Sequence, residues 1–255
     1  MRFTDKVVLV TGGGSGVGRA IALGFAREGA TVVVAGRGRE ALEQTVKLIE
    51  AEGAGAAALP VDVTDSADVA RLIGDIVGRY GRLDVAVNNA GTFAAGTVAE
   101  LAEEDWARVM EVNATGVFLA MKHEIAAMRA QHGGTQGGGV IVNISSNIGA
   151  HVRIPGVGAY AASKAAVSAL TRTAALECIE ENIRINAVSP GALDAPMSLR
   201  PGETPADRAN RMRDENPIGR VGTLDEITGT VLWLASDEAG FAVGLDLVLD
   251  GGAAA

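Results

Sequence analysis

The chain has 255 residues, of which 48% are apolar and 21% are charged, and its formal net charge is −9 at pH 7. This composition is typical of a soluble globular protein with a sizeable core. The negative charge disfavours nucleic acids and anionic membranes as partners. No apolar run reaches the roughly 20 residues of a membrane helix, and the first residues lack the pattern of a secretory signal.

The cysteine and the histidines exclude two further classes of site. Cys178 is the only cysteine, so an intrachain disulfide is impossible and a cytoplasmic location is favoured. His123, His132 and His151 are scattered and have no acidic or cysteine partners at ligand spacing, so we expect no metal. We interpret His151 as a solvent-exposed loop residue, with a position facing a substrate as the alternative.

Short β-branched apolar runs alternate with helical patterns along the whole chain. The predicted strands are residues 6–10, 31–35, 56–60, 83–87, 140–144, 182–188 and 245–249. The predicted helices are residues 19–27, 40–52, 66–80, 103–131, 158–176 and 223–235. This alternation predicts an α/β, single-domain Rossmann fold over residues 1–255, with a doubly wound, mostly parallel seven-stranded sheet and helices on both faces.

A glycine-rich loop joins the first strand to the first helix. Backbone N–H groups at a helix start offer partial positive charge to a pyrophosphate, and glycines permit tight turns and a close ligand approach. A plain flexible loop is the alternative. The loop predicts a dinucleotide site that contains Gly12, Ser15, Gly16, Val17 and Gly18.

The end of the second strand bears on the choice of dinucleotide. An acidic residue there would accept a hydrogen bond from a ribose 2′-hydroxyl and repel a 2′-phosphate. The sequence instead has Gly36-Arg37-Gly38-Arg39, in which Arg37 can pair with a phosphate. We expect NADP(H), with NAD(H) as the second choice. The alternative is that both arginines only solvate the start of the next helix.

Polar residues also follow the other strands. They include Asp62-Val63 after the third strand, Asn88-Asn89-Ala90-Gly91 after the fourth, Ser145-Ser146 after the fifth and Ser189-Pro190-Gly191 after the sixth. The carboxyl ends of parallel strands form the edge at which such sheets bind ligands. The two amides of the fourth group could close the nucleotide cleft or serve only in a turn.

Three segments depart from regular periodicity. Asn113 and Gly116 interrupt the helical pattern of residues 103–131 and predict a local bend there. Residues 132–139 are rich in glycine and are expected to form a flexible surface loop. Residues 192–216 lack clear periodicity and are interpreted as a mobile lid over a substrate pocket.

Tyr160 and Lys164 are four residues apart in a predicted helix and therefore share one face. A fixed ammonium beside a phenol favours the phenolate and lowers a pKa that is normally about 10. The pair is then suited to acid–base chemistry near neutral pH. The alternative is a half-buried tyrosine and a surface lysine on an ordinary helix.

Taken together, these motifs resemble the classical short-chain dehydrogenase/reductase family over about residues 5 to 252. The resemblance is carried by Thr11-Gly12, Gly16, Gly18, Asp62, Asn88-Asn89-Ala90-Gly91, Asn113, Ser145-Ser146, Tyr160, Lys164 and Pro190-Gly191. Each motif alone is modest, and their joint order and spacing make the identification specific.

The resemblance implies roles for the catalytic residues. Tyr160 would be the general acid in ketone reduction and the base in alcohol oxidation. Lys164 would hold the nicotinamide ribose and lower the pKa of Tyr160. Ser146 would hydrogen-bond the substrate oxygen, and Asn113 would order a water in a proton relay.

The resemblance also implies a cofactor site and an assembly. The phosphate loop would be shaped by Gly12, Gly16 and Gly18, and the adenine would meet Asp62. The rest of the cofactor would be lined by Asn89, Ala90 and Gly91. Family members are commonly tetramers, so a homotetramer is expected.

The sequence departs from the family pattern at several positions. Ser146 lies one residue further from Tyr160 than usual, so either the loop 147–157 carries an extra residue, which we prefer, or Asn147 takes the place of the serine. Ala195 stands where a threonine usually meets the nicotinamide carboxamide. Val243 replaces another threonine, with an expected effect on packing only.

The sequence thus predicts a carbonyl reductase or alcohol dehydrogenase for a small or medium ketone or secondary alcohol. The alternatives are an NAD-dependent dehydrogenase of the same family and a catalytically silent nucleotide-binding sensor. The complete set of Asn113, Ser146, Tyr160 and Lys164 argues against the silent sensor.

Overall fold

The computed structural model describes residues 1–131 and 138–255. Its strands form one seven-stranded sheet in the order β3-β2-β1-β4-β5-β6-β7. They are β1 (Val7–Thr11), β2 (Thr31–Gly36), β3 (Ala56–Pro60), β4 (Val85–Asn88), β5 (Gly139–Ile144), β6 (Ile183–Pro190) and β7 (Asp246–Leu249). Every neighbouring pair is parallel, which confirms the predicted sheet.

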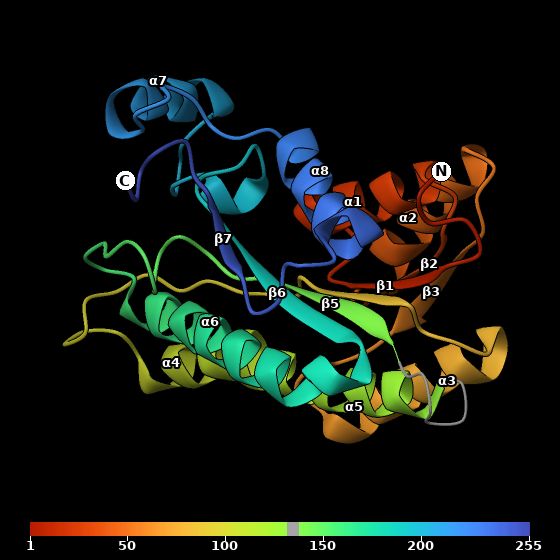
Figure 1. Ribbon diagram of the computed structural model, residues 1–255. Coiled ribbons are helices and arrows are strands. Elements are labelled where there is room, and N and C mark those ends of the chain that lie inside the picture. The colour runs from red at the N-terminus through yellow and green to blue at the C-terminus, as the bar shows by residue number, and fades with distance from the viewer. Residues whose placement is uncertain (132–137) are drawn as a thin grey trace.

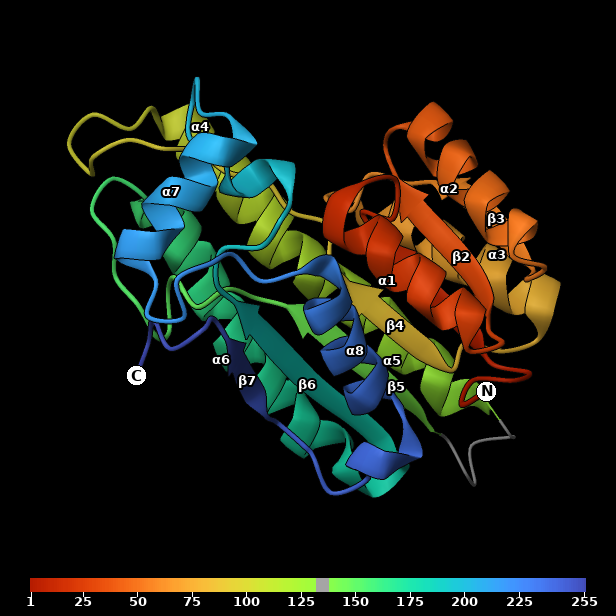
Figure 2. The ribbon, with the colours of Figure 1, turned by 90° about the horizontal axis from the view of Figure 1, so that it is seen from above.

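Helices cover both faces of the sheet (Figure 1, Figure 2). One face carries α1 (Gly16–Arg27), α2 (Arg39–Ala51) and α8 (Leu224–Ala235), and the other carries α3 (Ser66–Tyr80), α5 (Gly116–Ala130) and α6 (Gly158–Cys178). Successive residues of β1 alternate between the two layers, because side chains of a strand point to opposite faces. Val8 and Val10 join the α1 layer, whereas Val7 and Leu9 join the α3 layer.

The helical pattern of residues 103–131 is interrupted, as predicted. It divides into α4 (Glu103–Met110), one π-helical turn η1 (Glu111–Thr115) and α5. A π-turn is a common form of helix interruption at functional sites. This turn contains Asn113, whose side chain is fully buried.

Residues 192–216 are more regular than expected. They contain the short 3₁₀ turn η4 (Pro196–Ser198) and the helix α7 (Pro205–Glu215), which lies beyond the carboxyl edge of the sheet (Figure 1). The sequence pattern missed α7 because it buries little apolar surface, chiefly at Met212. Its start does carry a signal, since Thr204 and Asp207 form a capping box. The mobility of this segment stays a prediction.

The predicted loop 132–139 lies mostly outside the described residues, and Gly139 already begins β5. Two further 3₁₀ turns are η3 (Ile179–Glu181) and η5 (Asp237–Ala239). Over the described ranges, no helix combines the length and apolar character required to cross a membrane.

A buried polar network links the centre of the sheet to α5 and α6. Asn88 Nδ2 donates to Glu124 Oε2 and to Asn143 Oδ1, both at 3.0 Å. Asn143 Nδ2 in turn donates to Thr171 Oγ1 at 2.9 Å. Glu124 is fully buried, and desolvation raises the pKa of its carboxyl to about 7 against the opposing effect of the Asn88 hydrogen bond. Asn88 therefore serves the core and does not reach the ligand edge.

Replacing Glu124 by glutamine is expected to change how stability depends on pH. A carboxyl whose pKa is raised on folding stabilises the protein below its unfolded pKa, and this contribution is lost as pH rises through the folded value of about 7. Ionised Glu124 thus destabilises the fold above pH 7 by about 3 kcal/mol. Denaturant unfolding of Glu124→Gln should show higher stability than the parent at pH 8.5 and a smaller advantage, or none, at pH 5. Parallel pH profiles for the two proteins would contradict this account.

Candidate active site

The glycine-rich loop after β1 is shaped for an anion. Gly12 and Gly16 have φ values of +66° and +50°, a left-handed region that favours glycine. Among the described residues, Ser15 makes no side-chain cap to α1, and the first turn of α1 has no acidic side chain. The first N–H groups of a helix carry partial positive charge and require acceptors. This helix start is therefore suited to the pyrophosphate of a dinucleotide.

Gly18 is required by a close contact inside the loop. A Cβ atom on Gly18 would lie 2.3 Å from Gly12 O and 2.5 Å from Asn89 Nδ2. Asn89 Nδ2 donates to Thr11 O at 3.1 Å, and Thr11 Oγ1 accepts from the backbone N–H groups of Asn89 and Ala90 at 3.0 and 3.1 Å. The loops after β1 and β4 are thus held together. Asn89 serves this junction through its side chain.

Two residues that the sequence analysis missed brace the same loop. Arg19 donates to Gly14 O and, through Nε, to Thr45 Oγ1 at 3.0 Å. Thr45 Oγ1 donates to Gly13 O at 2.9 Å. Thr45 is fully buried on α2, and a hydroxyl on the buried face of an amphipathic helix was the available signal.

Arg37 and Asp62 lie at the ends of β2 and β3. Asp62 Oδ1 accepts from Thr64 N and Thr64 Oγ1 at 3.0 and 2.8 Å, and these bonds, followed by the charge of Arg37, lower the pKa of the Asp62 carboxyl. Arg37 is exposed, and within the described part of the chain no ion pair is recorded for it. Arg39 instead pairs with Glu43 at 3.8 Å. Arg37 is thus the arginine available to a ligand.

Val63 contributes mainly to packing. It is buried, and a Cβ atom on Gly116 would lie only 3.0 Å from Val63 Cγ2. This contact turns the Val63 side chain towards α5. Any contact of Val63 with a cofactor would therefore use its backbone.

Tyr160 and Lys164 lie in the first turns of α6. The Tyr160 ring meets the Phe93 ring edge-on, with centroids 5.2 Å apart. Desolvation raises the pKa of the Tyr160 phenol, and the neighbouring Ser146 hydroxyl acts in the opposite direction. Lys164 Nζ is buried and donates to Ile144 O at 2.8 Å, and burial lowers the pKa of Lys164 to about 8.

The pKa of Tyr160 therefore moves in the direction opposite to the one expected from its spacing to Lys164. The spacing does bring the two groups together, since Lys164 Nζ lies 5.9 Å from the centroid of the Tyr160 ring. The ammonium is, however, directed to the Ile144 carbonyl. Desolvation of the phenol is the largest cause of the shift, and the opposing influence on its pKa comes from Ser146.

Ser146, and not Asn147, lies beside Tyr160. The Ser146 hydroxyl lies near enough to the Tyr160 phenol to lower its pKa, and Ser146 Oγ accepts from Ile148 N at 3.1 Å. Asn147 Nδ2 donates to Asp250 Oδ2 at 3.1 Å instead. This geometry favours the interpretation that the loop 147–157 contains one extra residue.

His151 was interpreted as a solvent-exposed loop residue, and this is wrong. Its Nε2 lies 2.9 Å from Asp246 Oδ2, and only 21% of its side chain is exposed. Asp246 Oδ1 also accepts from Ser189 Oγ at 2.5 Å. His151 thus ties the loop after Ser146 to β6 and β7. A lone histidine in a loop gave no sign of a partner that lies 95 residues away.

Asn113 fixes the loop that follows β4. Its Oδ1 accepts from Thr92 N at 2.7 Å, and its Nδ2 donates to Thr92 O at 2.9 Å and to Ser163 Oγ at 3.1 Å. A Cβ atom on Gly91 would lie 3.4 Å from Asn113 Oδ1 and 3.8 Å from Lys164 Nζ. The π-turn therefore places Asn113 close to the lysine, at the same end of the sheet.

The segment after β6 completes the site. Pro190 O accepts from Asn147 N, and Gly191 N donates to Leu249 O, both at 2.9 Å. Ala195 Cβ is 4.0 Å from the position of a Cβ on Gly16, so this segment lies over the glycine-rich loop. Val243 packs against the core on the α6 side, as expected.

These residues fit a dinucleotide along the carboxyl edge of the sheet. The glycine-rich loop of residues 12–18, called the glycine cradle below, and the uncapped start of α1 suit the pyrophosphate. Arg37 and Asp62 lie towards β2 and β3, and Tyr160 lies beyond β5. For the described residues, no group of three His, Cys, Asp or Glu side chains is arranged to hold a metal ion.

Adding one methyl group at Gly18 should abolish cofactor binding. The new Cβ of Gly18→Ala would overlap the Gly12 carbonyl, so the loop would have to move. Gly78→Ala in α3 is the matched control, because a Cβ there meets nothing within 4 Å and alanine favours the helix. Calorimetric titration should find no nicotinamide nucleotide binding for Gly18→Ala and parental binding for Gly78→Ala. Parental affinity in Gly18→Ala would contradict the proposed cradle.

Comparison with known proteins agrees with this geometry. A family model described as "Enoyl-(Acyl carrier protein) reductase" matches residues 12–254. The chain is 40% identical to the 3-oxoacyl-(acyl-carrier-protein) reductase FabG of Thermotoga maritima, with 99% of each chain covered. It is 39% identical to the cyclopentanol dehydrogenase of a Comamonas species, with 98% of each covered. A crystal structure of a short-chain type dehydrogenase/reductase from Mycobacterium marinum superposes with a TM-score of 0.91 at 35% identity, covering 98% of this chain and 96% of that one. The chain therefore belongs to the short-chain dehydrogenase/reductase family of nicotinamide-dependent oxidoreductases.

Proposed function

We propose that the protein is an NADP(H)-dependent carbonyl reductase or alcohol dehydrogenase for a small or medium ketone or secondary alcohol. The observation that carries this proposal is the placement of the Tyr160 ring beside Ser146 and 5.9 Å from the ammonium of buried Lys164, at the edge of the sheet that also carries the glycine-rich loop. The bound nicotinamide supplies or accepts the hydride. Side chains of this protein orient the substrate and transfer the proton.

In the reduction direction, Ser146 and Tyr160 together hydrogen-bond the carbonyl oxygen of the substrate. Negative charge develops on this oxygen as the carbonyl carbon is reduced, and donors already aimed at it stabilise the transition state. Tyr160 then transfers its phenolic proton to the oxygen. The raised pKa of Tyr160 keeps the phenol protonated, which is the form that reduction requires. Lys164 would hold the cofactor ribose, and Asn113 would order a water that returns a proton.

The surroundings of Tyr160 favour an uncharged substrate. Phe93, which packs against the Tyr160 ring, is an apolar side chain that is 39% exposed. The names of the two relatives point to the same chemistry, since cyclopentanol is a secondary alcohol and a 3-oxoacyl group contains a ketone. A neutral ketone with an apolar body is the substrate class that these side chains suit.

The preference for NADP(H) rests on Arg37. Its exposed guanidinium lies close enough to Asp62 to affect the pKa of that carboxyl, at the end of the site where the adenine ribose is expected. A 2′-phosphate there would gain a charge-assisted hydrogen bond. We further propose a single cytoplasmic domain with a mobile lid at residues 192–216. Family membership favours a homotetramer, and Phe118 and Leu176 expose apolar surface that such an assembly would bury.

Removing the Tyr160 hydroxyl should stop turnover without loss of cofactor binding. Tyr160→Phe removes the proton donor, and we expect kcat to fall by about 10²–10⁴-fold in assays that follow nicotinamide absorbance with ketones and alcohols. Tyr80→Phe, at the other tyrosine of the chain, is the control and should retain parental kcat. Survival of activity in Tyr160→Phe would remove this residue as the acid.

Reversing the charge at Arg37 should separate the two nicotinamide cofactors. Arg37→Asp would repel a 2′-phosphate and accept a hydrogen bond from a 2′-hydroxyl, so NADPH affinity should fall about 10–100-fold. NADH affinity should be unchanged or improved. Arg39→Asp is the control, because Arg39 pairs with Glu43 and should affect both cofactors little. Equal losses for NADPH and NADH in Arg37→Asp would eliminate the NADP(H) assignment.

A further inference from the structure

Arg208 of α7 is buried, although it belongs to a mostly polar helix. Only 5% of its side chain is exposed. Its Nη1 donates to Ser198 Oγ at 2.8 Å and to Ala195 O at 3.2 Å, and its Nη2 pairs with Asp194. Among the described residues, its Nε has no hydrogen-bond partner. Burying a guanidinium costs free energy. All the hydrogen bonds and the ion pair of Arg208 are made to residues 194–198, and this concentration on one short stretch requires an explanation.

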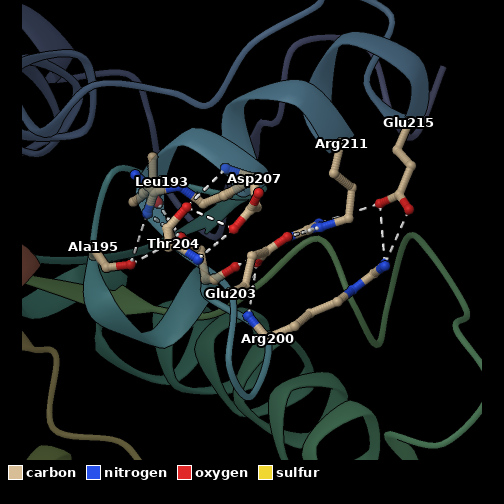
Figure 3. Close-up of polar contacts among 10 residues, drawn as sticks. Leu193, Ala195, Arg200, Glu203, Thr204, Asp207, Arg211 and Glu215 are labelled. Carbon is tan, nitrogen blue, oxygen red and sulfur yellow. Dashed lines mark hydrogen bonds and ion pairs between the residues drawn. The ribbon is translucent and has the colours of Figure 1, made fainter.

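That stretch, Asp194–Ser198, is held by hydrogen bonds at its first residue and by further hydrogen bonds from Ser198. At the base, Asp194 N donates to Gly222 O at 2.8 Å, and Gly222 N donates to Ala192 O at 2.9 Å. Within the stretch, Ser198 Oγ contacts Leu193 O and Ala195 O at 2.6 and 2.8 Å. Figure 3 shows Leu193 and Ala195 on the side of the start of α7, near Thr204 and Asp207. Arg208 joins this stretch to the helix through Asp194, Ala195 and Ser198.

The outer side of α7 is tied to the same segment by ion pairs. Arg211 pairs with Glu203 at 2.7 Å and with Glu215 at 3.2 Å, and Arg211 Nη2 also donates to Ser198 O at 3.1 Å (Figure 3). Arg200 pairs with Glu215 at 3.0 Å. The pairs to Glu215 are exposed and contribute little individually, but the Arg211–Glu203 pair is largely shielded from solvent and fixes how α7 lies on residues 198–203. The orientation of Arg208 is thereby fixed as well.

The location of the stretch identifies the half of the ligand that it meets. Ala195 Cβ is 4.0 Å from the position of a Cβ on Gly16, at the helix start suited to the pyrophosphate. The stretch follows β6, whereas Arg37 and Asp62 follow β2 and β3 on the opposite side of β1. A dinucleotide that runs from β3 across β1 towards Tyr160 therefore meets this stretch only with its nicotinamide half.

We propose that Arg208 is a positioning residue that holds Asp194–Ser198 over the nicotinamide half of the cofactor. Ala195 has no hydroxyl to offer, so the stretch acts through the placement of its backbone, and Arg208 determines that placement by binding the Ala195 carbonyl. The inference rests on the proposed dinucleotide chemistry. It adds that binding of the nicotinamide half, and not of the adenine half, depends on a residue in α7.

The test compares a whole cofactor with its adenine half. Arg208→Met removes all the donors, and Arg208→Lys keeps the charge. Arg213→Met is the matched control, because Arg213 is an exposed arginine of the same helix. Calorimetry measures Kd for NADPH and for 2′,5′-ADP, and for NADH and ADP, alongside kcat and Tm. We expect Arg208→Met to weaken NADPH and NADH about tenfold and to lower kcat, with unchanged affinity for both adenine fragments. Arg208→Lys should recover part of the loss, and Arg213→Met should match the parent.

A second variant guards against a failure of Arg208→Met to fold. Ser198→Ala keeps the guanidinium and removes one acceptor, so it should weaken NADPH and NADH in the same selective way but less. Equal weakening of whole cofactors and adenine fragments, or a fall in Tm with parental binding, would show that Arg208 is only structural. Failure of the proposed function is distinguishable, because the parent protein itself would then not bind nicotinamide nucleotides or reduce ketones.

Discussion

The contact between Gly18 and the Gly12 carbonyl is the constraint on which the site depends. A Cβ on Gly18 would lie 2.3 Å from that oxygen, so no other residue lets α1 begin so close to the end of β1. This closeness directs the first N–H groups of α1 at the ligand edge of the sheet. The loop after β4 is fastened to the same place through Asn89 and Thr11. The pyrophosphate site and the approach to Lys164 are therefore set by one junction.

Desolvation determines the chemistry at the other end of the site. It raises the pKa of Tyr160 and lowers that of Lys164 to about 8. Each shift disfavours a charged form, as expected for groups taken out of water. The raised pKa favours the protonated phenol, which is the form that the proposed reduction requires, whereas the proposed oxidation of an alcohol would require a phenolate.

Features that follow from a periodic pattern, such as the strands and most helices, could be predicted from the sequence. Features that depend on individual contacts between distant residues could not. Alternation of β-branched runs with helical patterns predicted the strands, strand ends indicated Gly12, Asp62 and Ser146, and helical spacing indicated Tyr160 with Lys164. α7 was missed because ion pairs, and not an apolar face, hold it in place. The direction in which the Tyr160 pKa shifts was predicted wrongly, because the spacing of residues along a helix indicates which groups are near each other but not how strongly they are desolvated. The hydrogen-bond partner of His151 could not be predicted, because Asp246 lies in β7, 95 residues further along the chain.

Several contacts that fix the loops could not be predicted from the sequence, because they are made by arginines to backbone carbonyls. Arg19 donates to Gly14 O beside the glycine cradle, and Arg208 donates to Ala195 O above it. Arg184 donates to Leu234 O, Ser236 O and Ala239 O at the end of α8. Every residue carries a carbonyl, so such a contact imposes no residue type on the partner and leaves no motif. Guanidinium groups are nevertheless well suited to the task, because their several N–H donors reach carbonyls of different segments at once. In a chain of net negative charge, these arginines act less as surface charges than as side chains that fix loop geometry, Arg19 and Arg208 at the ligand edge and Arg184 at the opposite edge of the sheet, where β6 begins.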